Sequence, residues 1–169
     1  SNNLTNASDV LKPVEPTESV KPTTTSQTTS VKLNRKAIPK PPARSSSRFS
    51  WPLEGRIISG FGAKDTGLRN DGINIEAPRG TAIKAAENGV VAYSGNELRG
   101  YGNMVLLKHS DGWITAYAHA DNLQVSRGQK VLKGQKIASV GSSGGVTSPQ
   151  LHFEIRKGMD PIDPLKYLQ

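Results

Sequence analysis

The sequence predicts an all-β domain over residues 51–169, and two observations lead to this fold class. Short runs rich in Val, Ile, Thr and aromatic residues recur from Trp51 to Gln169, separated by turn signals at close spacing. Several runs alternate apolar and polar residues, which is the period of a strand with one buried face. With an apolar share of 34% in 169 residues, the chain has material for one hydrophobic core, so we expect one folded domain.

Turn dipeptides and helix signals divide this domain into elements. The dipeptides Asn88-Gly89 and Asp111-Gly112 predict tight turns, and the second lies between two well-patterned runs, as in a hairpin. The stretch from Asp163 to Leu168 predicts one short helical turn that packs its Leu and Tyr side chains on the sheet. The expected strands cover residues 56–59, 81–84, 89–93, 103–109, 113–119, 136–140 and 151–156.

Residues 1–50 are expected to form a disordered, basic linker rich in Pro, Ser, Thr and Lys. Its scattered single apolar residues cannot bury enough surface to offset the entropy of ordering. It carries eight Lys and Arg residues against three Asp and Glu residues, which is most of the net charge of +8. A passive tether is the simpler interpretation, and a Pro-rich ligand for a partner domain is the alternative. The composition changes at Trp51-Pro52, where we place the boundary.

Composition excludes several classes of protein. No cysteine is present, which excludes a disulfide framework, a thiolate zinc site and a thiol nucleophile. No stretch approaches the roughly 18 apolar residues of a membrane helix, so membrane contact is expected only through an anchor outside residues 1–169. The basic linker lacks interleaved aromatic residues, so we expect attraction to anionic cell-wall polymers or lipid head groups rather than nucleic-acid binding.

Two of the three histidines lie in expected strands and mark a candidate site. In the run from Gln150 to Arg156, alternation places Gln150, His152 and Glu154 on one face and apolar residues on the other. His119 ends another strand, and spacing alone leaves a purely structural histidine as the commoner alternative. His109, beside an expected hairpin turn, is predicted to be exposed and without a role. A polar face on an apolar-backed strand indicates a site on the surface of the sheet.

Three motifs in order make residues 51–169 similar to the lysostaphin-type (LytM-like) peptidoglycan endopeptidases. The stretch from Asn70 to Pro78 occupies the place of the family's His-x-Gly-x-Asp motif, residues 117–119 that of Tyr-Ala-His, and residues 150–154 that of His-x-His-Phe-Glu. The resemblance implies an antiparallel β-sheet with a groove, in which zinc and a bound water hydrolyse a peptide bond.

The departures from these motifs argue against catalysis. The resemblance places the zinc ligands on Asn70, Asn74 and His152, and the two histidines that assist beside the metal on His119 and Gln150. Two ligands are thus amides, which lack the charge or the imidazole lone pair that zinc selects. One imidazole would supply roughly 3–4 kcal/mol, or about millimolar affinity, if a full site is worth on the order of 10–16 kcal/mol. We therefore expect no metal and no other cofactor, and a protein that is not an enzyme.

Two further segments, residues 51–55 and 96–105, are similar to the LytM domains of NlpD- and EnvC-type proteins, which activate N-acetylmuramoyl-L-alanine amidases. This resemblance implies a degenerate domain whose vacated groove binds an amidase in the periplasm of a Gram-negative bacterium, during cell-wall remodelling and daughter-cell separation. Tyr117 as a core residue and Tyr101 as a brace for a glycine turn are the alternatives to groove roles. The residues expected to line the groove are Asn70, Asn74, Arg99, Tyr101, Tyr117, His119, Gln150 and His152.

Two other functions stay open on the sequence alone. A peptidoglycan-binding module without a regulatory role would use the same groove for stem peptides. A residual peptidoglycan endopeptidase would need a different metal arrangement. The sequence does not identify the amidase, an upstream anchor or LysM-type domain, the oligomeric state, or a segment that blocks the groove.

Overall fold

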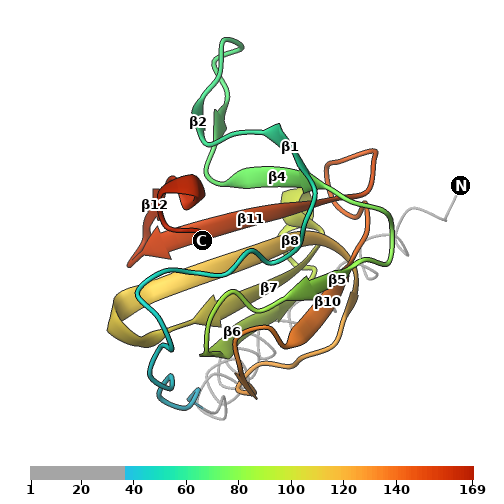
Figure 1. Ribbon diagram of the computed structural model, residues 1–169. Coiled ribbons are helices and arrows are strands. Elements are labelled where there is room, and N and C mark those ends of the chain that lie inside the picture. The colour runs from blue at the N-terminus through green and yellow to red at the C-terminus, as the bar shows by residue number, and fades with distance from the viewer. Residues whose placement is uncertain (1–36) are drawn as a thin grey trace, which may run out of the picture. The chain divides into compact units, whose positions relative to one another are not determined.

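The computed structural model describes residues 37–169, which form a curved antiparallel sheet (Figure 1). Its ten strands are all paired antiparallel, and no helix in this part of the chain is long and apolar enough to cross a membrane. The main path of the sheet runs through β1 (Arg56–Ser59), β4 (Ile73–Glu76), β11 (Gln150–Lys157), β8 (Trp113–Leu123), β7 (Asn103–Lys108), β6 (Gly89–Gly95) and β9 (Lys130–Val131).

Shorter elements complete the domain. β10 (Lys136–Val140) pairs with β8 and with β5 (Ala82–Lys84), and β12 (Asp160–Ile162) pairs with β11. The separate hairpin of β2 (Gly62–Ala63) and β3 (Arg69–Asn70) projects beyond β1 and β4 (Figure 1). Three 3-10 turns follow the strands: η2 (Arg99–Tyr101), η3 (Ser110–Gly112) and η4 (Pro164–Lys166).

The all-β prediction is confirmed, and all seven expected strands are present. β1 and β10 have the predicted bounds, and η3 joins β7 to β8 at the predicted hairpin turn. η4 also forms as expected, because the Asp163 carboxylate accepts a hydrogen bond of 3.0 Å from the amide of Leu165 and caps the turn. β2, β3, β4, β9 and β12 were not predicted as separate strands.

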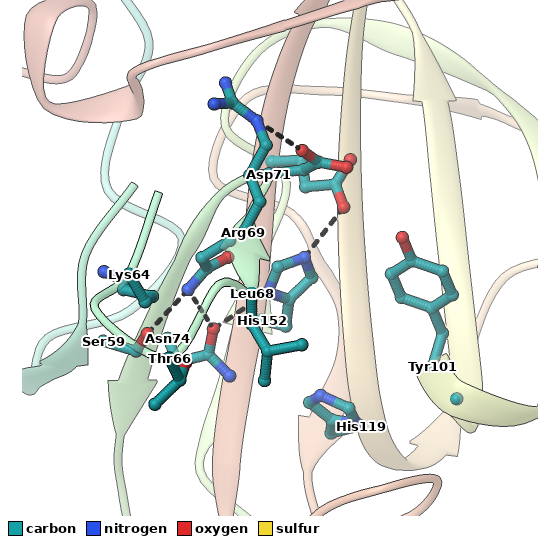
Figure 2. A pocket seen from close by; sticks show the side chains of 13 residues that line it. Ser59, Lys64, Thr66, Leu68, Arg69, Asp71, Asn74, Tyr101, His119 and His152 are labelled. Atoms are coloured by element: carbon teal, nitrogen blue, oxygen red, sulfur yellow. Dashed lines mark hydrogen bonds and ion pairs between the residues drawn. The ribbon is translucent and has the colours of Figure 1, made fainter. Parts of the chain in front are cut away.

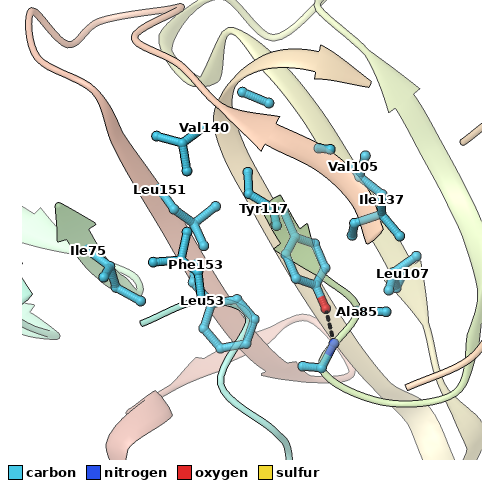
Figure 3. Packing of buried hydrophobic residues seen from close by; sticks show 14 of the residues in the cluster. Leu53, Ile75, Ala85, Val105, Leu107, Tyr117, Ile137, Val140, Leu151 and Phe153 are labelled. Carbon is cyan, nitrogen blue, oxygen red and sulfur yellow. Dashed lines mark hydrogen bonds between the residues drawn. The ribbon is translucent and has the colours of Figure 1, made fainter. Parts of the chain in front are cut away.

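The hydrophobic core lies on one face of the sheet, under β5 and β10 (Figure 3). Leu151, Phe153 and Ile155 of β11 belong to this core, whereas His152 and Glu154 line a cavity on the other face, so the alternation predicted for this strand is confirmed. Gly72 allows β4 to approach β11, because a Cβ there would lie 2.1 Å from the carbonyl oxygen of Phe153. This close packing fixes β4 beside the polar face of β11.

β8 changes partners at His119, and the backbone bends there. Its first half pairs with β11 and β7, and its second half pairs with β10. His119 has a φ of +65°, in the left-handed region that non-glycine residues rarely adopt. A residue with this backbone conformation changes the direction in which its side chain points from the strand. Strained backbone conformations of this kind are often found at functional sites.

The folded unit begins at Ile38, thirteen residues before the predicted boundary at Trp51. Phe49 is completely buried in the core and forms a parallel bridge with Leu168. The predicted linker is therefore too long at its C-terminal end, because residues 38–50, here called the strap, pack on the domain. The remaining part of the predicted linker, residues 1–36, lies outside the described residues.

A buried carboxylate holds the strap at Ser45 and Ser46. The Ser45 amide and hydroxyl both donate to Oε1 of Glu87 at 2.9 Å, and the Ser46 amide donates to Oε2 at 3.1 Å. Burial would raise the pKa of Glu87, but hydrogen bonds from the amides of Ser45 and Asn88 hold it below its ordinary value. The charged carboxylate thus ties the strap to the loop before β6.

The prediction for His109 is wrong, because this histidine is buried against the ring of Phe49. Its Nδ1–H donates to the carbonyl of Asn88 at 2.7 Å, and its Nε2 accepts from the Thr115 hydroxyl at 2.8 Å. Burial lowers the pKa of His109 to about 4, so the ring is neutral at pH 7. Its role is structural.

Candidate functional site

A polar groove lies on the face of the sheet opposite the core. Its cavity has a volume of about 460 Å³. Figure 2 shows His152 and His119 between Tyr101 on one side and Ser59 and Lys64 on the other. The lining residues are Ser59, Lys64, Thr66, Leu68, Arg69, Asn70, Asp71, Asn74, Gly100, Tyr101, His119, His152 and Glu154.

Three amide side chains form one directed chain of hydrogen bonds along the groove. Asn70 Nδ2 donates to Asn74 Oδ1 at 3.0 Å, and Asn74 Nδ2 donates to Gln150 Oε1 at 2.8 Å. Backbone groups anchor both ends: the Gly72 amide donates to Asn70 Oδ1, and Gln150 Nε2 donates to the carbonyl of Ser148. Because a backbone amide only donates and a carbonyl only accepts, these anchors fix the orientation of every amide between them.

This orientation determines the surroundings of His152. Asn74 Oδ1, an acceptor, lies 2.9 Å from Nδ1 of His152, and Glu154 Oε2 lies 2.8 Å from Nε2. Both ring nitrogens therefore lie within hydrogen-bond distance of acceptor oxygens. Burial would raise the pKa of Glu154, but hydrogen bonds from His152 and Arg156, together with their charges, hold it below its ordinary value.

The donor set does not fit zinc. Asn70 Oδ1 and Asn74 Oδ1 already accept hydrogen bonds, and both ring nitrogens of His152 are engaged by oxygen atoms of Asn74 and Glu154. Zinc sites in proteins require thiolate, imidazole or carboxylate ligands with accessible lone pairs. Within residues 37–169, no three His, Asp or Glu side chains converge as a possible metal site. The side chains at the ligand positions instead form a hydrogen-bond network with one another and with Gln150 and Glu154.

His119 presents a different kind of nitrogen to the groove. Its Nδ1–H donates to the carbonyl of Ser143 at 2.8 Å, which leaves Nε2 as an acceptor facing the cavity. Burial lowers the pKa of His119 and the nearby His152 lowers it further, although the hydrogen bond to Ser143 opposes this. A neutral His119 can accept a hydrogen bond from a bound partner.

The structure gathers most of the predicted groove residues, with two exceptions. Tyr101 lines the groove with its ring 5.7 Å from that of His152, and burial, followed by the charge of Glu154, raises the pKa of its hydroxyl. Arg99 is exposed and does not line the cavity, although its neighbours Gly100 and Tyr101 do. The prediction is wrong for Tyr117, which is buried in the core with its hydroxyl 2.9 Å from the Ala86 amide (Figure 3).

The prediction omitted two charged groups that hold the groove together. Arg156 Nε donates to Glu154 Oε1 at 2.6 Å, and the Arg156 guanidinium lies 3.7 Å from the carboxylate of Asp71. The alternation that placed Gln150, His152 and Glu154 on one face continues to Arg156, so the sequence pattern could have predicted Arg156 on that face. Asp71, in the turn between β3 and β4, had no comparable signal.

The sequence is similar to that of a known peptidase family and to several cell-wall proteins. Residues 68–164 match the model of Peptidase family M23. The chain is 48% identical over 128 residues to the cell division protein DipM of Caulobacter vibrioides, which covers 72% of this chain and 21% of that protein. It is 48% identical over 122 residues to the murein hydrolase activator NlpD of Escherichia coli, covering 72% of this chain and 31% of that protein.

A solved structure gives the same result for the fold. The catalytic domain of lysostaphin from Staphylococcus simulans superposes with a TM-score of 0.62 at 28% identity, over 67% of this chain and 91% of that chain. The antiparallel sheet of this chain, with its groove at the three sequence motifs, has the fold of a lysostaphin-type peptidase domain. The chain belongs to peptidase family M23. It spans about a fifth to a third of the length of the two relatives named above.

Proposed function

We propose that this chain is a non-catalytic M23 domain that activates a peptidoglycan-cleaving N-acetylmuramoyl-L-alanine amidase. The observation that carries the proposal is the directed amide chain, which occupies two of the three ligand positions, Asn70 and Asn74. The third position, His152, has its two ring nitrogens engaged by Asn74 and by the Glu154 carboxylate. Without a metal, no group in the groove lowers the pKa of a water toward neutrality. The name of the relative NlpD, murein hydrolase activator, supports the regulatory role.

The groove is the surface proposed to bind the amidase. Eight residues were predicted to line this surface, and Tyr117 is excluded because it is buried in the core. Of the remaining seven, all but Arg99 line the cavity or belong to the amide chain. Activation requires that the chain bind the open amidase more tightly than the closed one, because equal affinity shifts no population. A location in the periplasm or cell envelope of a Gram-negative bacterium is part of the proposal, supported by the relatives named as murein hydrolase activator and lipoprotein.

The proposal is tested by release of dye from labelled peptidoglycan sacculi. The chain, a purified periplasmic amidase from the same organism, and the two together are compared with zinc supplied. We expect release to rise above that of the amidase only in the mixture. Release by the chain alone would establish an endopeptidase, and binding to sacculi without stimulation would establish a peptidoglycan-binding module.

Arg99 provides a second test, because it lies on η2 next to the groove residues Gly100 and Tyr101 and makes no side-chain hydrogen bond or ion pair within the described residues. Charge reversal in Arg99→Glu should abolish stimulation if the partner presents an acidic residue there, since such contacts are charge-assisted. Lys130→Glu reverses an exposed charge on β9 and is the matched control. Stimulation by a folded Arg99→Glu protein at the wild-type level would remove Arg99 from the interface.

A further inference from the structure

The sheet face that carries the groove is apolar over β7 and β8, next to the polar floor. In an antiparallel sheet with one solvated face, side chains that point away from the core are normally polar. Here Leu106 of β7 lies beside Ala116 of β8, and Ala116 lies beside Glu154 of β11. Ile114 occupies the next outward position on β8. This face therefore departs from the expected alternation where it adjoins the groove.

Two loops turn this apolar face into a pocket. Leu98 lies in the connection before η2, and Met159 lies in the turn between β11 and β12. Arg156 fixes the second loop by donating to the carbonyl of Met159 at 3.1 Å. The cavity has a volume of about 220 Å³, and its apolar lining consists of Leu98, Met104, Leu106, Ile114, Ala116 and Met159.

The rim of this pocket is exposed to an unusual degree. Leu98 is 48% exposed and Met159 is 81% exposed, although both are large apolar residues. Exposed apolar side chains around a concave surface mark interaction sites when they gather in one patch. Methionine also adapts to the shape of a bound side chain, because it is unbranched and flexible.

The pocket adjoins the groove, since Tyr101 and Glu154 line both. We propose that the pocket is a second anchor site, which takes a large apolar side chain from the amidase segment bound in the groove. This inference rests on the proposed function. Tyr101 separates the two cavities, so a single extended or helical segment can contact it from both sides.

The chemistry of the pocket selects a protein segment as the occupant. The oxygens of Glu154 accept from His152 and Arg156, so this carboxylate is already satisfied. An occupant therefore gains mainly from apolar area, at roughly 25 cal/mol per Å². A leucine, methionine or phenylalanine side chain fills a cavity of this size, whereas a peptide whose largest apolar group is a methyl leaves most of it empty.

The test replaces both rim residues with a charged one, in Leu98→Asp combined with Met159→Asp. The matched control is Leu132→Asp combined with Leu165→Asp, at apolar residues that are 65% and 46% exposed elsewhere. A conservative variant, Leu98→Met with Met159→Leu, keeps the pocket apolar. The readout is the concentration of the chain that gives half-maximal stimulation of the purified amidase, together with the dissociation constant by calorimetry.

We expect the Asp pair at the rim to raise both values at least tenfold, while the control and the conservative variant stay within twofold of the wild type. All three variants should keep the wild-type melting temperature, because the substituted side chains are exposed. Wild-type affinity in the rim variant would overturn the pocket inference and leave the activator function intact. Failure of the wild-type chain to bind or stimulate the amidase would overturn both.

Discussion

At the scale of single residues, amide side chains account for the character of the groove. An amide both donates and accepts, so Asn70, Asn74 and Gln150 can satisfy one another in sequence between a backbone amide and a backbone carbonyl. The sequence showed that amides stand at two of the zinc-ligand positions. The hydrogen bonds that join Asn70, Asn74 and Gln150 could not be predicted, because they depend on the register between β4 and β11.

Glu154→Gln tests the charge network beneath the groove. The substitution preserves shape but removes the negative charge between His152 and Arg156, so we expect the free energy of unfolding at pH 7 to fall by about 3 kcal/mol. Urea denaturation measures the change. Glu76→Gln, which breaks the exposed ion pair with Arg56, should stay close to the wild type. Equal effects in the two variants would contradict a stabilising role for the buried network.

His109 predicts a dependence of stability on pH. Its folded-state pKa of about 4 lies below the ordinary value of 6.5, so between these values the unfolded chain binds a proton that the folded chain does not. The stability contributed by the neutral ring is complete above pH 6.5 and is lost as the pH falls toward 4, by about 3 kcal/mol.

Denaturation at a series of pH values checks this dependence in His109→Gln against the wild type. The variant should be less stable at pH 7, and its stability should change less between pH 6.5 and 4, with His119 and His152 still present in both proteins. If the free energy of unfolding changes with pH in the variant as it does in the wild type, a group other than His109 causes the dependence.

At the scale of elements, the sequence predicted every strand of five or more residues, but it missed β4, a four-residue strand whose buried and less buried side chains alternate. The two-residue strands β2, β3 and β9 are too short for any period to be recognised. Alternation also placed the face of β11 correctly, but it could not locate the bend of β8, because the φ of +65° at His119 follows from a change of strand partners.

The strap shows why composition misplaced the domain boundary. Phe49 is one apolar residue among polar neighbours, and composition averages over it. Its ring nevertheless packs edge-on against His109 and Trp113, with centroid distances of 5.5 Å to both. The buried ring of Phe49 and the carboxylate of Glu87 are two of the contacts that hold the strap.

Phe49→Ala should therefore destabilise the protein as a core substitution does. We expect a loss of about 3–5 kcal/mol in the free energy of unfolding, from lost apolar burial and the cavity left behind. The same substitution at Phe61, which is only partly buried beside Arg69, is the control and should cost about 1 kcal/mol. If Phe49→Ala costs no more than Phe61→Ala, the strap does not contribute to the core.

At the scale of the whole molecule, the motifs predicted the fold and the position of the groove, because they fix strand order and the face of each strand. The apolar pocket beside the groove was not predicted. It arises from two loops distant in sequence, around Leu98 and Met159, that meet over β7 and β8. Loops of this kind set which partner a shared fold can bind.

The extent of the folded unit gives a further prediction. A chain of residues 51–169 should be less stable than one of residues 38–169 by more than the effect of Phe49→Ala. The shorter chain also loses the three hydrogen bonds from Ser45 and Ser46 described for the Glu87 carboxylate. Comparison of the two fragments by urea denaturation measures this, and equal stability would return the boundary to Trp51.

The parallel bridge between Phe49 and Leu168 has a mechanical consequence. The Phe49 amide donates to the carbonyl of Tyr167, and the Gln169 amide donates to the carbonyl of Phe49, each at 2.9 Å. Suppose that the strap is pulled toward the N-terminus and Gln169 toward the C-terminus. The two hydrogen bonds are then loaded in shear, so they must break together. The bonds of Glu87 to the strap take up the load first. A pull along the chain is thus carried near its ends, away from the groove, whose geometry stays undisturbed while the domain bears tension.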